Sequence, residues 1–449
     1  MRKSSWPLVA VVALVLGATG VLNVSARSSN GPTNPNVTGP SAQSSALYCT
    51  GLTNARGELR GEVTFINTTG ATRHVIVHAV ATRALAAVAT AFTLKPYSRQ
   101  VVAPTRLLVG QTYALAAQID GGGVSAEQVV SSHGTQAPCV NEGVTDWYAS
   151  GFDTLVGSRA VLSIYNPTAT AAVFNVTTFS PSGFLSPAPL QGVSVGAHAI
   201  ITFDLGQYVV ATRNVGVEVT VLRGSLVVVG DQVSGETSSV NAGTSVLSTN
   251  GTFPLVTTSQ GAVAQVRVAN PGPAPATVTI KVKVGKFLVA PQSTSVAPYS
   301  SSVVVITPNT AIPAAGEASL TMTSSKPVDA TLVTGTPNGL TLSPLGALVS
   351  RAVLSDVTGG GFARATVTNA SLMDTNLAWD LVRHGVLSAT GHATLGASEN
   401  LSLGQLIGGR AKLQGATLIL TSSSAVLVVN AILNTSPGGV TMAAALNGG

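Results

Sequence analysis

The sequence repeats itself at intervals of about one hundred residues, counted from one recurring asparagine. Each copy of the repeat places an Asn between two runs of alternating apolar residues. The four stretches are EVTFINTTGATRHVIVHA, VLSIYNPTATAAVFNVTT, AQVRVANPGPAPATVTIKVKV and ARATVTNASLMDTNLAWDLV, with their asparagines at Asn67, Asn166, Asn270 and Asn369. The intervals of 99, 104 and 99 residues predict one structural unit that occurs four times.

Apolar residues keep a period of two on both sides of each asparagine. Residues four and two positions before it are Val63 and Phe65, Leu162 and Ile164, Val266 and Val268, and Ala365 and Val367. Residues eight, ten and twelve positions after it are Val75, Val77 and Ala79; Phe174, Val176 and Thr178; Val278, Ile280 and Val282; and Leu377, Trp379 and Leu381. This period is typical of half-buried antiparallel strands. We therefore expect the four asparagines in equivalent turns, and we expect Trp379 to face its core.

A second turn signal recurs about thirty residues after each asparagine. It is LKPYS with Pro96, SVGAH with Gly196, VAPYS with Pro298 and TLGAS with Gly396. About seven short strands per hundred residues, separated by Gly and Pro turns, are typical of an immunoglobulin-like β-sandwich. The expected fold is all-β, a tandem array of about four such sandwiches. Its expected domains are residues 47–144, 145–238, 239–349 and 350–449.

The N-terminus has the features of an export signal. Arg2 and Lys3 precede an apolar run from Pro7 to Leu22, and small residues follow at Ser25 and Ala26. Residues 1–26 are therefore expected to be either a cleaved signal peptide or a membrane anchor. Residues 27–46, rich in Ser, Asn, Gly, Pro and Thr, are expected to form a flexible linker that spans roughly 25 Å. The folded body is expected outside the cytoplasm.

The two cysteines, Cys49 and Cys139, are interpreted from this location. Disulfides persist in exported proteins, and the cysteines lie 90 positions apart with no His or Cys at a spacing from them that is typical of a metal or redox site. We expect one structural disulfide between Cys49 and Cys139, within or at the edge of the first sandwich.

The second copy of the repeat resembles a known family. DWYASGF at its start, NPTATAAVFNV at its turn, and the segments GVSVGAHAIITFDL and GSLVVVGDQV near its end resemble actinobacterial exported or membrane-anchored proteins that carry domain of unknown function 5719. The resemblance extends from Cys49 to the C-terminus. It implies a location in the cell envelope and carries no catalytic residues over to this chain.

Composition argues against several classes of function. Only 9% of residues are charged, and the 23 Lys and Arg residues are scattered, so we expect no nucleic-acid partner. Gly192 to Gly196 matches the G-x-S-x-G pattern of hydrolases, but a strand-like segment follows it instead of a helix. His74 and His78 would lie about 13 Å apart on a strand, too far to share a metal ion. We expect no catalytic residues, no cofactor and no metal.

One cluster, Asp146, Trp147 and Tyr148, is the candidate partner-binding site. It combines polar and aromatic side chains at the expected start of the second domain, and ligand sites form preferentially between domains. The alternative is that Trp147 only packs between domains. The sequence thus favours a non-catalytic structural or interaction protein of the bacterial envelope. A protein that binds cell-wall carbohydrate is the alternative, because aromatic side chains can stack on sugars.

Overall fold

The computed structural model describes most of the chain from Ser45 onward. The described residues are 45–53, 61–83, 87–129, 136–235, 237–257, 263–284, 287–307, 317–336, 339–346, 348–355, 362–424, 427–434, 440–444 and 446–447. The expected signal or anchor at 1–26, and the linker apart from its last two residues, lie outside them. All described residues belong to one compact unit.

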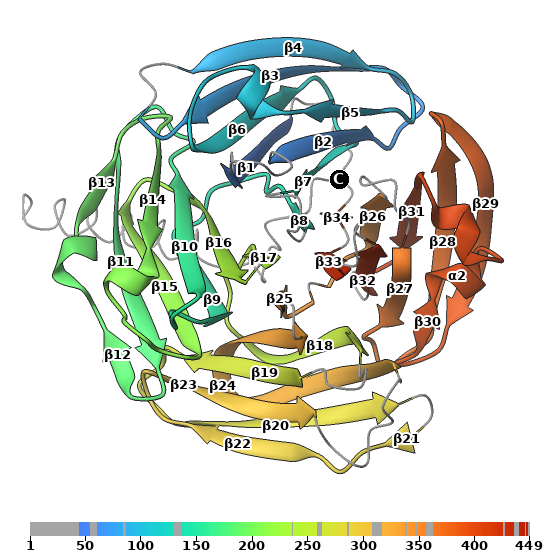
Figure 1. Cartoon of the computed structure of the whole chain (residues 1–449). Helices are drawn as coiled ribbons and strands as arrows, with labels where there is room; N and C mark the ends of the chain where they lie inside the picture. Colours follow the sequence, from blue (N-terminus) through green and yellow to red (C-terminus); the bar gives the residue numbers. More distant parts are fainter. Residues whose placement is uncertain are drawn as a thin grey trace, which may run out of the picture. The chain divides into compact units, whose positions relative to one another are not determined.

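The described strands form four successive sandwiches, coloured from blue to red in Figure 1. Sandwich 1 contains β1 (Ser45–Thr53), β2 (Glu62–Asn67), β3 (Arg73–Ala81), β4 (Val88–Leu94), β5 (Arg99–Val102), the short 3-10 helix η1 (Pro104–Arg106), β6 (Thr112–Ile119), β7 (Val124–Val129) and β8 (Gln136–Pro138). Sandwich 2 contains β9 (Asp146–Phe152), β10 (Ser158–Tyr165), β11 (Ala172–Ser180), β12 (Gly183–Leu185), η2 (Ala188–Leu190), β13 (Val193–Val195), β14 (Ile200–Asp204), η3 (Leu205–Gln207), β15 (Val215–Arg223), β16 (Val227–Ser234) and β17 (Thr237–Asn241).

The second half of the chain repeats this plan. Sandwich 3 contains β18 (Ser248–Thr257), β19 (Val263–Asn270), β20 (Ala276–Val284), β21 (Phe287–Leu288), β22 (Gln292–Val296), β23 (Ser300–Thr307), β24 (Glu317–Thr336) and β25 (Gly339–Pro344). Sandwich 4 contains β26 (Arg351–Ser355), β27 (Phe362–Asn369), β28 (Thr375–Arg383), β29 (Val386–Leu395), β30 (Asn400–Ser402), α2 (Leu403–Leu406), η4 (Arg410–Leu413), β31 (Ala416–Ser422), β32 (Leu427–Asn434), β33 (Val440–Ala444) and β34 (Leu446–Asn447). The expected boundary between residues 238 and 239 falls inside β17, so the strands of sandwich 2 continue to Asn241.

Each sandwich has two antiparallel sheets. Sheet I contains the strand that ends at the repeat asparagine, and its strand orders are β5-β2-β7-β8, β14-β10-β16-β17, β23-β19-β24-β25 and β30-β27-β32-β33. Sheet II contains the strand that follows the asparagine turn, and its orders are β4-β3-β6-β1, β12-β11-β15-β9, β21-β20-β24-β18 and β29-β28-β31-β26. The long β24 gives its first half to sheet II and its second half to sheet I.

The all-β tandem sandwich fold is confirmed, with one difference in strand order. In an immunoglobulin constant domain the first strand lies beside the second, and the last strand lies beside the sixth. Here β1 pairs with β6 and β7 pairs with β2, so the first and last strands have exchanged sheets. The alternating apolar residues around each asparagine fill the core between the two sheets, as predicted, while Trp379 is half-buried and packs against that core.

The four asparagines lie in equivalent turns and make the same hydrogen bonds, which confirms the repeat. All four are buried, with at most 1% of their surface exposed. Asn67 Nδ2 donates to the carbonyl oxygens of Ala71 (2.7 Å) and Lys95 (3.0 Å), and its Oδ1 accepts from the Thr69 N–H (3.0 Å). The equivalent partners are Thr170, Gly196 and Thr168 for Asn166; Ala274, Ala297 and Gly272 for Asn270; and Met373, Gly396 and Ser371 for Asn369.

These bonds join the asparagine turn to the second turn of the repeat. In that second turn one residue has a positive φ in every copy: Tyr97 (54°), His198 (51°), Tyr299 (52°) and Ser398 (55°). Its N–H donates to a carbonyl oxygen of the asparagine turn, at Thr69, Thr168, Gly272 and Ser371 respectively. The buried amide therefore satisfies carbonyl groups that a tight pair of turns would otherwise leave without partners.

The sandwiches contact one another through equivalent faces. At the junctions of sandwiches 1 and 2 and of sandwiches 2 and 3, sheet I of the later sandwich packs on sheet II of the earlier one, and the residue that precedes the repeat asparagine lies at the contact. Tyr165 packs with Val80 and Ala114 of sandwich 1. Ala269 lies so close to Gly216 of sandwich 2 that a Cβ atom at Gly216 would come within 2.5 Å of the Ala269 Cβ. Glycine is required there by the close approach of the two sheets.

The same contact joins sandwich 4 to sandwich 1. Ile66, which precedes Asn67, packs with Val353, Val382 and Ile419 of sandwich 4. Arg351 donates from Nη2 to Thr68 Oγ1 at 3.1 Å across this junction. β33 also pairs with β8 in parallel, with Ala443 opposite Gln136. The contacts therefore form a closed cycle from sandwich 1 to sandwich 4 and back.

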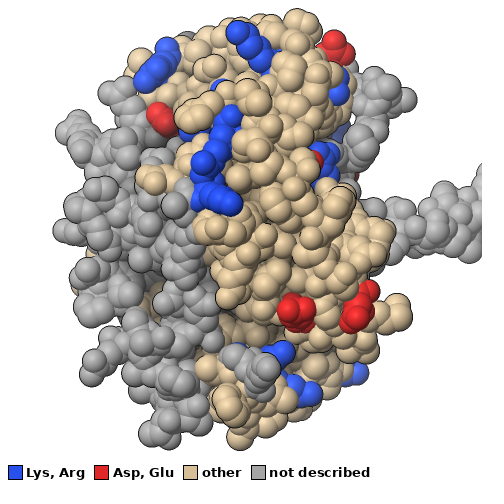
Figure 2. Space-filling model, turned by 90° about the vertical axis from the view of Figure 1, so that its right-hand side faces the viewer, with Lys and Arg blue, Asp and Glu red and all other residues tan. Residues whose placement is uncertain are grey.

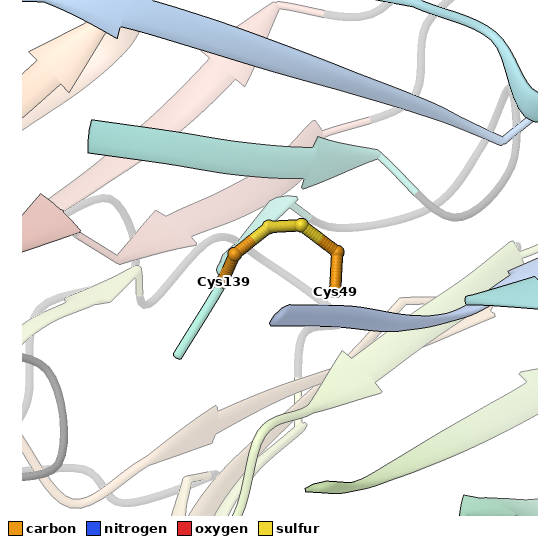
Figure 3. Close-up of a disulfide and its surroundings, with 2 residues drawn as sticks. All are labelled: Cys49 and Cys139. Carbon is orange, nitrogen blue, oxygen red and sulfur yellow. A yellow bond between two sulfur atoms is a disulfide. The ribbon is translucent and has the colours of Figure 1, made fainter. Parts of the chain in front are cut away.

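The predicted disulfide between Cys49 and Cys139 is present, with Cα atoms 4.7 Å apart (Figure 3). Cys49 lies on β1 in sheet II, and Cys139 follows directly after β8 in sheet I. The bond thus joins the two sheets of sandwich 1 across its core, where both cysteines are buried. It closes a separation of 90 residues between the first and last strands of that sandwich.

Candidate functional site

The candidate residues Asp146, Trp147 and Tyr148 open β9, which is the edge strand of sheet II in sandwich 2. Because neighbouring side chains on a strand point to opposite faces, Trp147 faces the core while Asp146 and Tyr148 face outward. Trp147 is only 2% exposed and belongs to the core cluster of sandwich 2. The ring that the carbohydrate alternative requires for stacking is therefore buried.

Trp147 is also bonded to the segment that leads to sandwich 3. Its Nε1 donates to the carbonyl oxygen of Ala242 at 2.7 Å. Gly243, at φ +66°, follows with no room for a side chain, since a Cβ atom there would lie 2.3 Å from the indole ring. Trp147 thus fixes the path of the chain between the two sandwiches, which is the structural role that the sequence left open beside partner binding.

The outward face of β9 carries a small polar cluster. Tyr148 lies directly opposite Glu218 of β15, and Asp146 lies opposite Thr220. Burial, together with the nearby carboxylates of Glu218 and Asp146, raises the pKa of the Tyr148 hydroxyl above its ordinary value. Burial also raises the pKa of Glu218, although the hydrogen bond from Tyr148 opposes the change. The cluster offers a phenol and two carboxylates for hydrogen bonds to a polar partner.

The rest of β9 forms the junction with sandwich 3. Ser150 Oγ lies 3.2 Å from both the Arg267 carbonyl oxygen and Thr331 Oγ1, so its single proton has two alternative acceptors at the junction. Asn241 Nδ2 donates to the Ser150 carbonyl oxygen (3.0 Å) and to Thr331 Oγ1 (3.2 Å). The candidate cluster therefore does belong to a strand at a domain junction, and the neighbouring sandwich is the third.

A buried ion pair that the sequence analysis missed lies at the same junction. Arg267 of β19 donates to Asp153 through Nη1 at 2.7 Å and through Nη2 at 3.1 Å, and both side chains are 7% exposed. Arg267 Nη1 also donates to the Gly151 carbonyl oxygen, and Asp153 Oδ1 accepts from the Asn214 N–H. One signal was present in the sequence: Arg267 occupies a strand position that is Thr64, Ser163 or Thr366 in the other copies.

The other motifs lie in ordinary strand positions. Ser194 of the G-x-S-x-G pattern lies on the short strand β13, paired with Val173 of β11. His74 is exposed and within hydrogen-bond distance of Thr93, and His78 is half-buried. Within the described ranges, no three His, Cys, Asp or Glu side chains come together in a way that could hold a metal ion.

Two further properties concern the charge of the surface and the length of the helices. On the face shown in Figure 2, Lys, Arg, Asp and Glu are few, and other residues make up most of the visible described surface. No helix in the described part of the chain is long and apolar enough to cross a membrane.

Comparisons with known proteins give no family assignment. No protein-family model matches the chain, and no curated protein matches it. Among solved structures, a Thermotoga maritima protein, 1070, is 19% identical over 22% of this chain and 90% of its own, with a TM-score of 0.20. A tetra-tandem repeat from the extending region of a large adhesion protein is 12% identical over 92% of this chain and 97% of its own, with a TM-score of 0.13.

A third similar structure is an enzyme. The exo-chitosanase CsxA of Amycolatopsis orientalis is 11% identical over 49% of this chain, with a TM-score of 0.14. This chain spans only 27% of the length of that enzyme. At such TM-scores none of the three similarities supports an inference about what this protein does.

Proposed function

We propose that this protein is a non-catalytic structural or interaction protein of the bacterial cell envelope, located outside the cytoplasm. The observation that carries the location is the disulfide between Cys49 and Cys139, because disulfides persist in oxidising compartments. The apolar segment at residues 1–26 supports the same location as a signal peptide or an anchor. The resemblance to domain of unknown function 5719 points to the envelope as well.

The use of the polar and aromatic side chains supports a structural role. Each repeat asparagine hydrogen-bonds two turns to each other, and Trp147 donates a hydrogen bond to the segment that connects sandwiches 2 and 3. The ion pair of Arg267 with Asp153 joins the same two sandwiches. The sandwiches contact one another within one compact unit, so the folded body presents several surfaces. Such a body is suited to hold or bind other envelope components without a reaction of its own.

The location is tested with the cysteines themselves. Cells are lysed in the presence of a maleimide polymer that adds mass to every free thiol, with and without a reductant. We expect no mass shift without reductant and a shift of two additions after reduction. A Cys49→Ser and Cys139→Ser double variant is the control that shows no shift in either case. Two free thiols in the untreated protein would contradict the proposed location.

Carbohydrate binding is the second candidate, because Tyr148, Glu218 and Asp146 form the polar cluster on the outward face of β9. The test is binding of the full chain to purified cell-wall glycans. Tyr148→Phe removes only the hydroxyl, and Tyr208→Phe, also in sandwich 2, is the matched control. Binding that is lost in the first variant and kept in the second favours a glycan-binding protein. Hydrolysis of the glycans by the folded protein would contradict the non-catalytic proposal.

A further inference from the structure

A row of polar side chains crosses the outward face of sheet II in sandwich 2, whose strands follow the order β12, β11, β15 and β9 (Figure 1). Residues that lie directly opposite each other on neighbouring antiparallel strands point to the same face of the sheet. Thr177 lies opposite Glu218, and Glu218 lies opposite Tyr148. Ser186, directly after β12, extends the row, since its Oγ lies 3.2 Å from Thr177 Oγ1. We call Ser186, Thr177, Glu218 and Tyr148 the polar row.

Two exposed aromatic rings lie beside the polar row. Phe184 of β12 lies two positions before Ser186 and on the same face, because alternate residues of an extended chain point the same way. The ring of Phe184 contacts the ring of Tyr299 in sandwich 3, with the two centroids 5.5 Å apart. Phe184 is 58% exposed and Tyr299 is 40% exposed. Phe184 is thus held between Tyr299 and the buried Phe179, which lies opposite it on β11, while both outer rings remain accessible.

The charged groups of this face lie away from the rings, toward β9. The row that follows the polar row along the strands contains three residues paired with one another, Asn175, Thr220 and Asp146. Glu218 and Asp146 are the charged side chains in these two rows, and both are half-buried. The basic residue of β15, Arg223, lies at the far end of that strand, opposite Val173. The two rows therefore offer carboxylates, hydroxyls and an amide to a ligand, but no cation.

The chain on both sides of each ring is uncharged. Residues 160–197, which include Phe184, contain no Asp, Glu, Lys, Arg or His, and neither do residues 287–316, which include Tyr299. Serine and threonine supply most of the polar side chains in these two segments. A ligand at the rings therefore finds apolar surface and hydroxyl groups in these segments, and no counter-charge for an ionic group.

We infer that this face binds an uncharged saccharide chain, with one sugar on the rings of Phe184 and Tyr299 and further sugars along the polar row. The face of an aromatic ring carries partial negative charge, which attracts the C–H groups of a sugar ring. Carboxylates accept hydrogen bonds from sugar hydroxyls, and the hydroxyls of the polar row both donate and accept. The row crosses three strand spacings, roughly 14 Å, which is long enough for more than one sugar. An anionic polymer would be repelled by Glu218 and Asp146.

The inference rests on the second candidate function, carbohydrate binding, and extends its site from Tyr148 and Glu218 on β15 and β9 to the junction with sandwich 3. Ligand sites form preferentially at such junctions between domains. The aromatic pair supplies the stacking surface that the buried Trp147 cannot supply.

The test is calorimetric titration of the full chain with defined hexasaccharides. Hexamers of glucose, mannose and N-acetylglucosamine are uncharged, a hexamer of galacturonic acid is anionic, and a hexamer of glucosamine is cationic. We expect at least one uncharged hexamer to bind, the anionic hexamer not to bind, and the affinity to be the same at about 50 mM and about 500 mM sodium chloride, because salt screens only interactions between charges.

Variants separate the rings from the polar row. Phe184→Leu keeps apolar bulk without a ring and should weaken binding about two- to tenfold, whereas Tyr299→Phe keeps the ring and should bind like the wild type. Glu218→Gln should weaken binding about tenfold. Phe287→Ala, which removes an exposed ring from the equivalent hairpin of sandwich 3, is the matched control and should change nothing. Unchanged unfolding midpoints show that the variants fold.

Three results would overturn the inference. The first is saccharide binding that Phe184→Leu leaves unchanged, which would keep carbohydrate binding but remove the rings from its site. The second is binding that falls steeply with salt or that prefers the glucosamine hexamer, which would show a cationic ligand. The third is binding to purified cell-wall glycans but to none of the uncharged hexamers, which would leave the second candidate function standing without this one. None of these results depends on the thiol test of location.

Discussion

Arg267 of sandwich 3 donates two hydrogen bonds to the carboxylate of Asp153 in sandwich 2, at 2.7 and 3.1 Å, with both side chains almost fully buried. A buried ion pair of this kind is costly to break, because the remaining charge has no water around it. Arg267→Met should lower the free energy of unfolding by about 3–5 kcal/mol. The measurement is denaturant-induced unfolding of the full chain.

The double variant Arg267→Met with Asp153→Leu checks the cause of that loss. Because it removes both charges, it should recover much of the stability that the single variant loses. A double variant as unstable as the sum of the two single variants would show that the ion pair does not couple the sandwiches.

The repeat asparagine should be one of the most sensitive positions in each sandwich. Asn166→Ala removes a buried amide whose Nδ2 and Oδ1 serve two turns, leaving the carbonyl oxygens of Thr170 and Gly196 without this donor. We expect a loss of about 2–4 kcal/mol in unfolding free energy. Asn376→Ala, on the exposed face of β28, is the control and should cost less than about 0.5 kcal/mol. Equal losses in the two variants would refute the structural role of the turn.

The disulfide should stabilise sandwich 1 by restricting the unfolded chain. Because it joins residues 90 positions apart, Cys49→Ser with Cys139→Ser should cost about 4–5 kcal/mol in the chain-entropy model. The unfolding of the double variant is followed by calorimetry. Unfolding in two steps, with the first sandwich melting earlier, would show that the closed cycle of contacts does not make the body cooperative.

Two buried carboxyls predict a dependence of stability on pH. Burial raises the pKa of Asp231 to about 6, opposed by the hydrogen bond from Ser238, and burial also raises the pKa of Asp329 to about 6. A carboxyl with a higher pKa in the folded state binds its proton more tightly there. Its contribution is therefore fully present below the unfolded pKa and is lost as the pH rises through about 6.

The unfolding free energy should accordingly fall between pH 4 and pH 7, by up to about 3 kcal/mol for each carboxyl. Asp231→Asn, which carries no charge at any pH and can still accept from Ser238, should be more stable than the wild type at pH 8 and similar to it near pH 4. The measurement is denaturant unfolding across this range. A variant with the same pH profile as the wild type would disprove the role of Asp231.

The sequence determined the repeated sandwich because its signals are local. The period of two around Asn67, Asn166, Asn270 and Asn369 depends only on which face of a strand each side chain occupies, and the turn residues lie a few positions away. The disulfide also followed from the sequence, since two cysteines in an exported chain leave one pairing. These features need no knowledge of how the sandwiches pack together.

The candidate site depended on contacts that the local pattern does not contain. The sequence predicted Trp147 to be a site residue because its neighbours are polar and aromatic. In the structure Trp147 lies in the core, and its Nε1 donates a hydrogen bond to the carbonyl oxygen of Ala242, 95 residues away. The pair of Asp153 and Arg267 joins residues 114 positions apart, and Ile66 packs on sandwich 4 because the contacts form a closed cycle. Only the tertiary structure decided these roles, because burial and partners are set by which sheets meet, and alternation within a strand is the same whichever sheet lies above it.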